Sequence, residues 1–427
     1  MNKKRKPIFL TIAIFAVILA GCAVFALKFP AKYRFVMKPP SGMKDLLTAS
    51  AAKASPDNSA FYDSDNLNSA MKFQLDMLKT TAEKDKNTFI SPLSAGIALT
   101  MAANGADGAT LEAFEKALGT NLNGLNNFYG AAQERLNNSA NPTVLNVANA
   151  IFVDDSRLKI SENFVEDCGN YFAAGLYSLD FSAPSSVKSI NNWAKDNTKG
   201  KIDEIIDSID VDQIMFLTNA VYFEGKWLNG FDKNKNYIGD FAAPPGEVKT
   251  EYMRKELECR YYNDDKIALA ILPYKGGEYS FMALMPSENF NGWLQNLTVK
   301  DYFELFEKTR KGEYTIGLPK FEAEFSYDLN EPLKKMGLTP AFDEDNANFT
   351  KIGEASGNIY ISAVSQKTYL KVDEEGTVAA VVTIMSLNDE GVEPSEIIFD
   401  KPFLYAIIEN KTNLPLFIGI MNDPTAE

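Results

Sequence analysis

The chain has 427 residues, of which 45% are hydrophobic and 12% aromatic, so it is long enough for one large or two smaller domains and too apolar to be disordered throughout. Its 57 acidic residues outnumber its 43 Lys and Arg residues, and the resulting net charge of −14 disfavours nucleic acid and anionic membrane surfaces as partners. The sequence contains no histidine, so no site can use imidazole as a general base, as a zinc ligand or as a sensor of near-neutral pH.

Residues 1–27 have the pattern of a targeting or anchoring segment. Residues 1–6 are basic, and residues 7–27 carry no charge over 21 positions, which is long enough to cross a bilayer as a helix whose start stays on the cytoplasmic side. Within this stretch, Leu19-Ala20-Gly21-Cys22 resembles the lipobox of bacterial lipoproteins, in which the bond before the cysteine is cut and the thiol is lipidated.

Two kinds of anchor remain open for this segment. The small residues before Cys22 favour cleavage and lipidation, whereas the apolar residues 23–27 favour an uncleaved transmembrane helix. Either anchor places the rest of the chain on the extracellular face of the cell membrane, attached only through its N-terminus; secretion is the alternative. Residues 28–66 are interpreted as a linker, because they lack a sustained apolar period, and residues 67–427 as the folded domain.

The first third of the domain is predicted to be mainly helical and the rest mainly strands. Apolar side chains recur at helical spacing in residues 69–84 and 110–118, and a helix is predicted to start at Ser91-Pro92 with Ser91 as its cap. Segments rich in Val, Ile, Phe and Tyr predict strands at 143–153, 213–223, 267–285 and 401–421. This distribution favours an α+β fold with a large, mostly antiparallel sheet.

Motifs for enzymatic chemistry are missing from the sequence. Neither G-x-x-x-x-G-K-[ST] nor G-x-G-x-x-G occurs, and adjacent carboxylates would diverge in an extended segment. Cys168 and Cys259 can pair only if folding brings them together, and two buried thiols are the plainer interpretation. We therefore expect no enzyme, no cofactor and no metal site.

A series of short motifs covers the chain from about residue 66 to its end. The first is Asn-Thr-Phe-Ile-Ser-Pro-Leu-Ser at residues 87–94, and Thr-Asn-Ala-Val-Tyr-Phe-Glu-Gly-Lys-Trp stands at residues 218–227. The others, in chain order, lie at residues 145–152, 190–193, 198–202, 281–286, 319–321, 400–403 and 413–419. In these motifs and their order the chain resembles the serpin family of serine protease inhibitors.

The resemblance implies one domain of three sheets and about nine helices, with a long exposed loop near the C-terminus. In inhibitory serpins a target protease cleaves this loop, which then inserts into the main sheet as a new strand and carries the acylated protease with it. The function implied is therefore suicide-type inhibition of a serine protease by a monomer. The alternative is a non-inhibitory serpin whose loop stays out and which acts as a binding or structural surface protein.

The segment after residue 372 resembles the hinge of inhibitory serpins. Its first residues are Asp373-Glu374-Glu375-Gly376, and residues 377–387 are uncharged and free of proline, as a central strand covered on both faces requires. The pattern favours an inhibitor over a non-inhibitory member. The hinge residues are Glu374, Glu375, Gly376, Thr377, Ala379 and Ala380.

The resemblance also implies a hydrogen-bonded cluster beneath the sheet. It corresponds to Ser91, Ser94, Asn219 and Gln366, and Trp227 corresponds to the tryptophan under the point where the loop enters. The family has a histidine at the position of Gln366. Since an amide donates and accepts hydrogen bonds but does not titrate, we expect sheet opening to lack the pH dependence of an imidazole.

The reactive bond is predicted from its distance to the hinge. In the family pattern the residue before the cleaved bond lies fourteen positions after Gly376, which gives Glu390 as that residue and Gly391 as the next one. Counting back from residue 401 instead gives Gly391 as the residue before the bond. Val392 would suit an elastase-like protease, and cleavage at Leu387 would shorten the inserted strand. The expected partner is a serine protease (elastase-like, subtilisin-like or Glu-specific), with a papain-like cysteine protease less favoured, and acidic residues near the bond favour one with a basic surface.

Overall fold

The structure is a computed structural model, and it describes residues 42–47, 55–137, 144–172, 175–210, 213–244, 246–377 and 396–426. These residues contain nine α-helices: α2 (Ser64–Thr81), α3 (Pro92–Ala103), α4 (Gly108–Leu118), α5 (Leu122–Asn137), α6 (Glu162–Tyr171), α7 (Ser186–Asn197), α8 (Phe290–Asn296), α9 (Val299–Lys308) and α10 (Asn330–Leu333). Short helical turns are η1 (Asn58–Tyr62), η2 (Lys233–Lys235), η3 (Lys334–Leu338) and η4 (Thr339–Phe342).

A seven-stranded sheet has the order β1-β5-β3-β6-β14-β12, with β15 beside the end of β6. Its strands are β1 (Lys44–Asp45), β3 (Val144–Asp154), β5 (Gly175–Leu179), β6 (Met215–Lys226), β12 (Phe321–Asp328), β14 (Ala363–Val372) and β15 (Gly376–Thr377). The pairs β3/β5 and β6/β14 are parallel, and the other neighbours in this sheet are antiparallel.

A nine-stranded sheet has the order β16-β11-β8-β9-β10-β17-β18-β2, with β7 beside β8. Its strands are β2 (Thr88–Ile90), β7 (Tyr237–Ala243), β8 (Gly246–Asn263), β9 (Ile267–Pro273), β10 (Tyr279–Pro286), β11 (Arg310–Pro319), β16 (Glu396–Ile398), β17 (Phe403–Glu409) and β18 (Pro415–Met421). Strands β4 (Leu158–Ile160) and β13 (Gly353–Ala355) form a third, two-stranded sheet. The described residues therefore have the predicted α+β architecture of three sheets.

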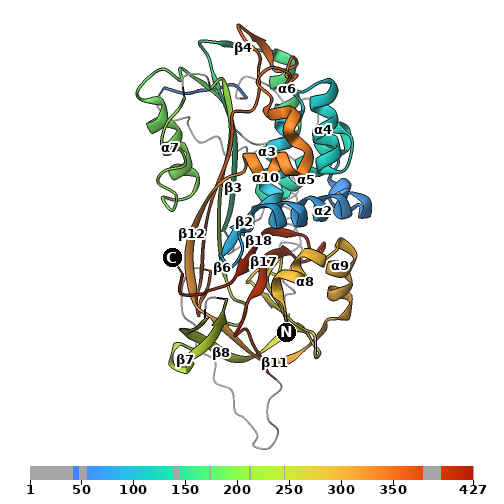
Figure 1. Cartoon of the computed structure of the whole chain (residues 1–427), viewed down its shortest axis with the longest axis vertical. Helices are drawn as coiled ribbons and strands as arrows, with labels where there is room; N and C mark the ends of the chain where they lie inside the picture. The colour runs from blue at the N-terminus through green and yellow to red at the C-terminus, as the bar shows by residue number, and fades with distance from the viewer. Residues whose placement is uncertain are drawn as a thin grey trace, which may run out of the picture. The chain divides into compact units, whose positions relative to one another are not determined.

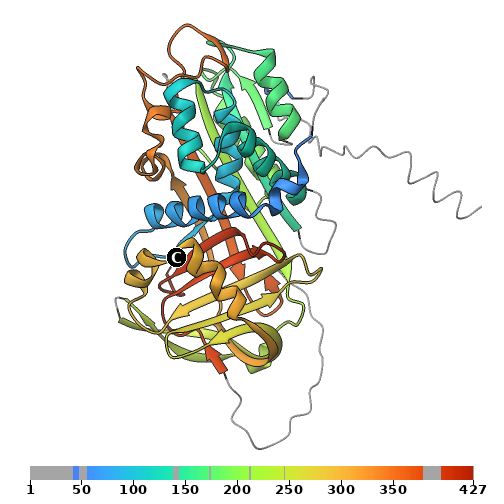
Figure 2. The ribbon, with the colours of Figure 1, turned by 90° about the vertical axis from the view of Figure 1, so that its right-hand side faces the viewer.

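Helices cover both faces of the seven-stranded sheet. Figure 1 shows α7 on one face and α3, α4 and α5 on the opposite side. On the α7 face, Phe152, Phe216 and Trp193 belong to a small apolar cluster, while the side chains that point the other way join the main core. Figure 2 shows α2, in blue, lying between the other N-terminal helices and the strands of the nine-stranded sheet.

Strand β1 covers the edge of the seven-stranded sheet. Lys44 pairs with Ser178 of β5, and the backbone N–H of Leu46 donates to the carbonyl of Leu176 at 2.9 Å. Met43 packs in the cluster on the α7 face, whereas Leu47 is buried in the main core. This short arm therefore joins the two apolar layers around the edge of the sheet.

Several predicted boundaries differ from the structure. The first helix starts at Ser64 instead of residue 69, because the Asp63 side chain accepts hydrogen bonds from the N–H groups of the first turn. The stretches predicted as single strands at 267–285 and 401–421 are two strands each, turning through Gly276-Gly277 and through Asn413, all with positive φ. Among the described residues, no helix has the length and apolar character needed to cross a membrane.

Candidate functional site

The seam between β6 and β14 lies in the middle of the seven-stranded sheet. The two strands pair directly and in parallel, from Ala363 opposite Phe216 to Tyr369 opposite Tyr222. Because both strands run in the same direction, a third strand antiparallel to both would fit between them. The chain leaves β14 at Val372, at the same edge where β6 ends.

A tight turn reverses the chain directly after β14. The N–H of Asp373 donates to the carbonyl of Gly376 at 3.0 Å, and the N–H of Glu375 donates to Oδ1 of Asp373 at 3.0 Å. Strand β15 then pairs antiparallel with the end of β6, with Gly376 opposite Lys226. Gly376 has φ +139°, and a Cβ there would lie 2.2 Å from the carbonyl oxygen of Gly225, so this position requires glycine.

A buried carboxylate holds the turn to its surroundings. Glu374 is 3% exposed; Asn236 donates to it, and Lys320 Nζ lies 3.0 Å from it and 3.0 Å from Glu251. Burial alone would raise the pKa of Glu374, but hydrogen bonds from its own backbone N–H, Asn236 and Lys320, together with the charge of Lys320, lower it below its ordinary value. We call Glu374, Lys320, Glu251 and Asn236 the hinge latch.

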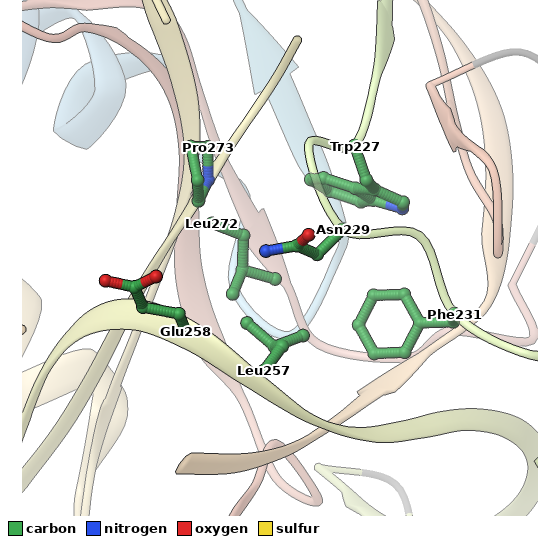
Figure 3. Close-up of a pocket in the computed structure, with 7 residues that line it drawn as sticks. All are labelled: Trp227, Asn229, Phe231, Leu257, Glu258, Leu272 and Pro273. Atoms are coloured by element: carbon green, nitrogen blue, oxygen red, sulfur yellow. The ribbon is translucent and has the colours of Figure 1, made fainter. Parts of the chain in front are cut away.

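Trp227 lies beneath the turn. Its Nε1 donates to the carbonyl of Asp373 at 2.8 Å, and its indole stacks on Tyr274 with ring centroids 4.8 Å apart. A small hollow of about 10 Å³ adjoins the indole, with Phe231, Leu257 and Leu272 around it (Figure 3). The turn therefore rests on an aromatic support, and its position depends on that ring.

Gln366 lies at the centre of a buried polar cluster. Its Oε1 accepts from the N–H of Ser91 at 2.8 Å, and its Nε2 donates to the carbonyl of Ser91 at 3.0 Å and to Oδ1 of Asn219 at 2.7 Å. Asn219 also donates to Ser94 and Asn149. The structure thus brings together Ser91, Ser94, Asn219 and Gln366, and joins α3 to the two strands of the seam.

Asn149 of β3 belongs to the same cluster, although sequence analysis did not identify it. Its Oδ1 accepts from Ser94 Oγ at 3.0 Å, and its Nδ2 donates to Gln133 at 3.3 Å. The prediction that Ser91 caps α3 was wrong for its side chain. The hydroxyl donates instead to the carbonyl of Leu416 at 2.7 Å, so it ties α3 to β18.

Replacing Gln366 with histidine should make the seam sensitive to pH. A neutral imidazole can replace one donor and one acceptor, but a protonated one cannot accept from Ser91, and its charge would be buried. Its folded pKa should therefore fall below the unfolded value of about 6.5. The stability that depends on the neutral imidazole is then fully present above the unfolded pKa of about 6.5 and is lost as the pH falls through the lowered folded pKa.

The pH prediction is measured as thermal midpoints between pH 5.5 and 7.5. We expect the wild-type midpoint to be nearly flat, since the chain has no histidine, and the Gln366→His midpoint to fall toward pH 5.5. A Gln366→Asn variant is the non-titrating control. Equal pH profiles for the histidine and asparagine variants would contradict the role assigned to this position.

The remaining predicted site residues divide into two groups. Cys168 and Cys259 are free, buried thiols, and burial, with the nearby Glu258, raises the pKa of Cys259 to about 12. Among the residues that the structure describes, no group of acidic, His or Cys side chains could hold a metal ion. The other predicted residues lie outside the described residues: Cys22, Ala379, Ala380, Leu387, Glu390, Gly391 and Val392.

Comparisons with known proteins agree on one family. A family model described as "Serpin (serine protease inhibitor)" matches residues 68–424. Iripin-2 of Ixodes ricinus is 32% identical over 353 residues, which cover 79% of this chain and 88% of that protein.

Two solved structures of the thermophilic serpin tengpin are similar to this fold. The structure described as the native state gives a TM-score of 0.83 at 33% identity and covers 89% of this chain and 99% of its own. The structure described as the latent state gives a TM-score of 0.73 at 34% identity and covers 84% of this chain and 98% of its own. By TM-score, the fold is nearer to the native-state structure.

Proposed function

The chain belongs to the serpin family, and from this we propose that it inhibits a serine protease by inserting its cleaved loop into the seven-stranded sheet. Members of this family are typically serine protease inhibitors and generally not enzymes. The observation that carries the proposal is the register of β15 on β6. Gly376 lies opposite Lys226 and Thr377 opposite Gly225. The chain after the hinge thus already points along the seam, antiparallel to both of its strands.

Extending this register supports insertion over the full length of β6. Each further step along the loop advances one residue back along β6, so Ala380 would face Tyr222, and Leu387 would face Met215, the first residue of the strand. Residues 377–387 are the uncharged run, and Asp389 follows just beyond it. The uncharged length of the loop and the length of the strand it would pair with therefore match.

The two faces of the inserted strand would also suit their surroundings. Directly opposed residues of antiparallel strands share a face. Val221 of β6 points into the main core, so Val381, which would lie opposite it, would also enter the main core. Ala220 points into the cluster under α7, so Val382 opposite it would enter that cluster. Thr383 would arrive opposite Asn219, where its hydroxyl could join the polar cluster of Gln366.

The proposal is tested by incubating the full chain with elastase-like, subtilisin-like, chymotrypsin-like and Glu-specific serine proteases and a papain-like cysteine protease. We expect one serine protease to form a complex that survives boiling in detergent, because the link is an acyl bond. Thr377→Arg places a charge at the start of the inserted strand and should turn the chain into a substrate. Asp389→Asn lies beyond the paired length, so the complex should still form, although the loss of an acidic residue near the bond should slow the encounter.

Two outcomes separate inhibition from the alternative function. Cleavage of the wild-type loop without any detergent-stable complex would favour a non-inhibitory serpin that acts as a surface-binding protein. Where a complex forms, the new N-terminus of the released peptide identifies the bond. We propose Glu390–Gly391, which requires Gly391 as that N-terminus, whereas Glu393 would indicate Val392 and Asn388 would indicate Leu387.

We also propose that the inhibitor is held on the extracellular face of a bacterial membrane through residues 1–27. If Cys22 is lipidated, Cys22→Ala should yield a longer, unlipidated chain on mass analysis, since neither cleavage nor acylation would occur. Ser41→Ala, in the predicted linker, is the control and should leave the processed mass unchanged apart from its own side chain. A Cys22→Ala chain that differs from wild type only by the side-chain mass would instead support a transmembrane anchor.

A further inference from the structure

The chain makes a compact turn directly after α7. Thr198 Oγ1 donates to the carbonyl of Ala194 at 2.9 Å and accepts from the N–H of Ile202 at 3.0 Å. Lys199 and Gly200 have φ of +53° and +74°, and the N–H of Gly200 donates to the carbonyl of Lys195 at 2.8 Å. The turn is therefore fastened to the end of the helix.

Two lysines of this turn lie over tyrosines on opposite sides of the seam. Lys201 Nζ is 5.1 Å from the ring centroid of Tyr369 on β14, and Lys199 Nζ is 5.9 Å from that of Tyr222 on β6. Tyr222 and Tyr369 are directly opposite each other in the register of the two strands. Both ammonium groups are within cation–π range. One short turn thus contacts both strands at the same level.

Carboxylates fix the orientation of both rings. Tyr222 Oη donates to Glu224 at 3.0 Å, and Tyr369 Oη donates to Glu322 on β12 at 2.6 Å. Lys199 Nζ also lies 3.7 Å from Glu224. The Tyr222 ring is therefore held from its own strand and the Tyr369 ring from the neighbouring β12, whereas both lysines lie on the turn after α7. The contact thus links the sheet to the helix that covers it.

We propose that Lys199 and Lys201 form a clasp across the seam, and that Lys201 is a positioning residue which slows strand insertion and so sets the share of cleaved chain that traps its protease. This inference rests on the proposed function. A new strand would move β6 and β14 apart by about 4.8 Å, the spacing of neighbouring strands. Two lysines on one fastened turn cannot then stay over both rings, so one contact must break.

The position of the clasp sets when it must open. The extended register places Ala380 opposite Tyr222, so the first residues of the loop can enter while the lysines are still in place. Insertion beyond Ala380 requires the two tyrosines to be apart. The clasp therefore acts on an intermediate stage, after entry at the hinge and before the strand reaches the cluster of Gln366.

The test measures how fast a synthetic peptide with the sequence of residues 377–387 enters the sheet of the uncleaved full chain, followed by native electrophoresis. We expect Lys201→Met to take up the peptide about two- to fivefold faster, which is the range for one exposed cation–π contact. Lys201→Arg keeps a cation over the ring and should behave as wild type. Lys195→Met, which removes an exposed lysine of α7 that pairs with Asp203, is the matched control.

Two further variants distinguish a clasp from a loss of general stability. Tyr369→Leu should reproduce the faster uptake and add nothing to Lys201→Met, while Tyr369→Phe, which keeps the ring, should stay near wild type. Lys201→Met should also lower the amount of chain needed to inactivate one equivalent of protease, while its own thermal midpoint falls by no more than about 1 °C.

The outcomes separate the clasp from the proposed function. If wild type takes up the peptide but Lys201→Met does so at the same rate as Lys195→Met, the clasp is wrong and the inhibitory function stands. If wild type takes up no peptide and gains no stability on loop cleavage, the inhibitory function is contradicted, and the clasp is overturned with it because no insertion exists for it to slow.

Discussion

Cleavage of the loop between Thr377 and Glu396 should raise the midpoint of thermal unfolding by roughly 10 °C or more. The uncharged run at residues 377–387 includes three valines, two alanines, and one each of isoleucine, methionine and leucine, and burying them contributes of the order of 10 kcal/mol. For a domain of this size, the midpoint moves by about 1 °C for each kcal/mol. Calorimetry of the intact and the cleaved chain measures the change, with the cut bond located by mass spectrometry.

A matched pair of variants shows whether the gain comes from insertion. Val381→Glu would bring a charge beside Val221 in the main core and should abolish the increase, because an unpaired buried charge is strongly unfavourable. Asp389→Asn lies beyond Met215, the first residue of β6, in the extended register, and the variant should gain as much stability as wild type. A cleaved wild-type chain that unfolds at the same temperature as the intact one would falsify the inhibitory mechanism.

Replacing Glu374 with lysine should be the most damaging single substitution in the hinge latch. The change removes a carboxylate that is 3% exposed and places a second ammonium beside Lys320. Breaking a buried ion pair costs about 3–5 kcal/mol. We expect the midpoint to fall by about 3–5 °C and the hinge to be released, with polymers forming as loops pair with sheets of other copies. Thermal scans and size-exclusion chromatography after incubation measure the two effects.

The control for this prediction is an ion pair on the surface of the same sheet. Glu324 pairs with Lys367 at 3.2 Å and its side chain is 48% exposed, so Glu324→Lys should cost at most about 1 kcal/mol.

The pH dependence of stability gives a second check on the hinge latch. Because the pKa of Glu374 is lowered, the stability from its charge is present above the ordinary glutamate pKa and is lost as the pH falls through the lowered value. The Glu374→Gln variant should not lose stability in this way as the pH falls. If stability falls equally with pH in the variant and in wild type, the role assigned to the hinge latch is contradicted.

The strands with two buried faces were the easiest to predict from the sequence. Every residue of β10 and β17 is buried, and such strands consist almost wholly of apolar residues. Strand β8 was missed, because its buried and exposed residues alternate and acidic and basic side chains interrupt the apolar pattern. Predicting a single strand where two form a hairpin had a different cause: the Gly276-Gly277 turn is short and apolar residues continue on both sides of it.

Within the candidate site, the motifs indicated which residues matter but not which partners they have. Lys320 lies in a recognised motif, yet its pairing with Glu374 and Glu251 depends on three segments far apart in the chain. Likewise, Asn149 lies within a motif, but only the alignment of β3 beside β6 brings it to Asn219. Such contacts depend on strand register, which a single sequence does not specify.

Strand β1 determines how a mechanical load on the N-terminal segment would enter the domain. A pull on the chain ahead of Gly42 reaches the sheet through the pairing of Lys44 with Ser178 and would open it from its outer end, one residue at a time. As β1 peels away, Met43 must leave the cluster around Trp193, and β5 becomes a bare edge. If the chain is anchored through residues 1–27 as proposed, tension on that segment would loosen the same sheet that accepts a new strand in the proposed mechanism. Force on the anchor and the ease of insertion would then be physically coupled.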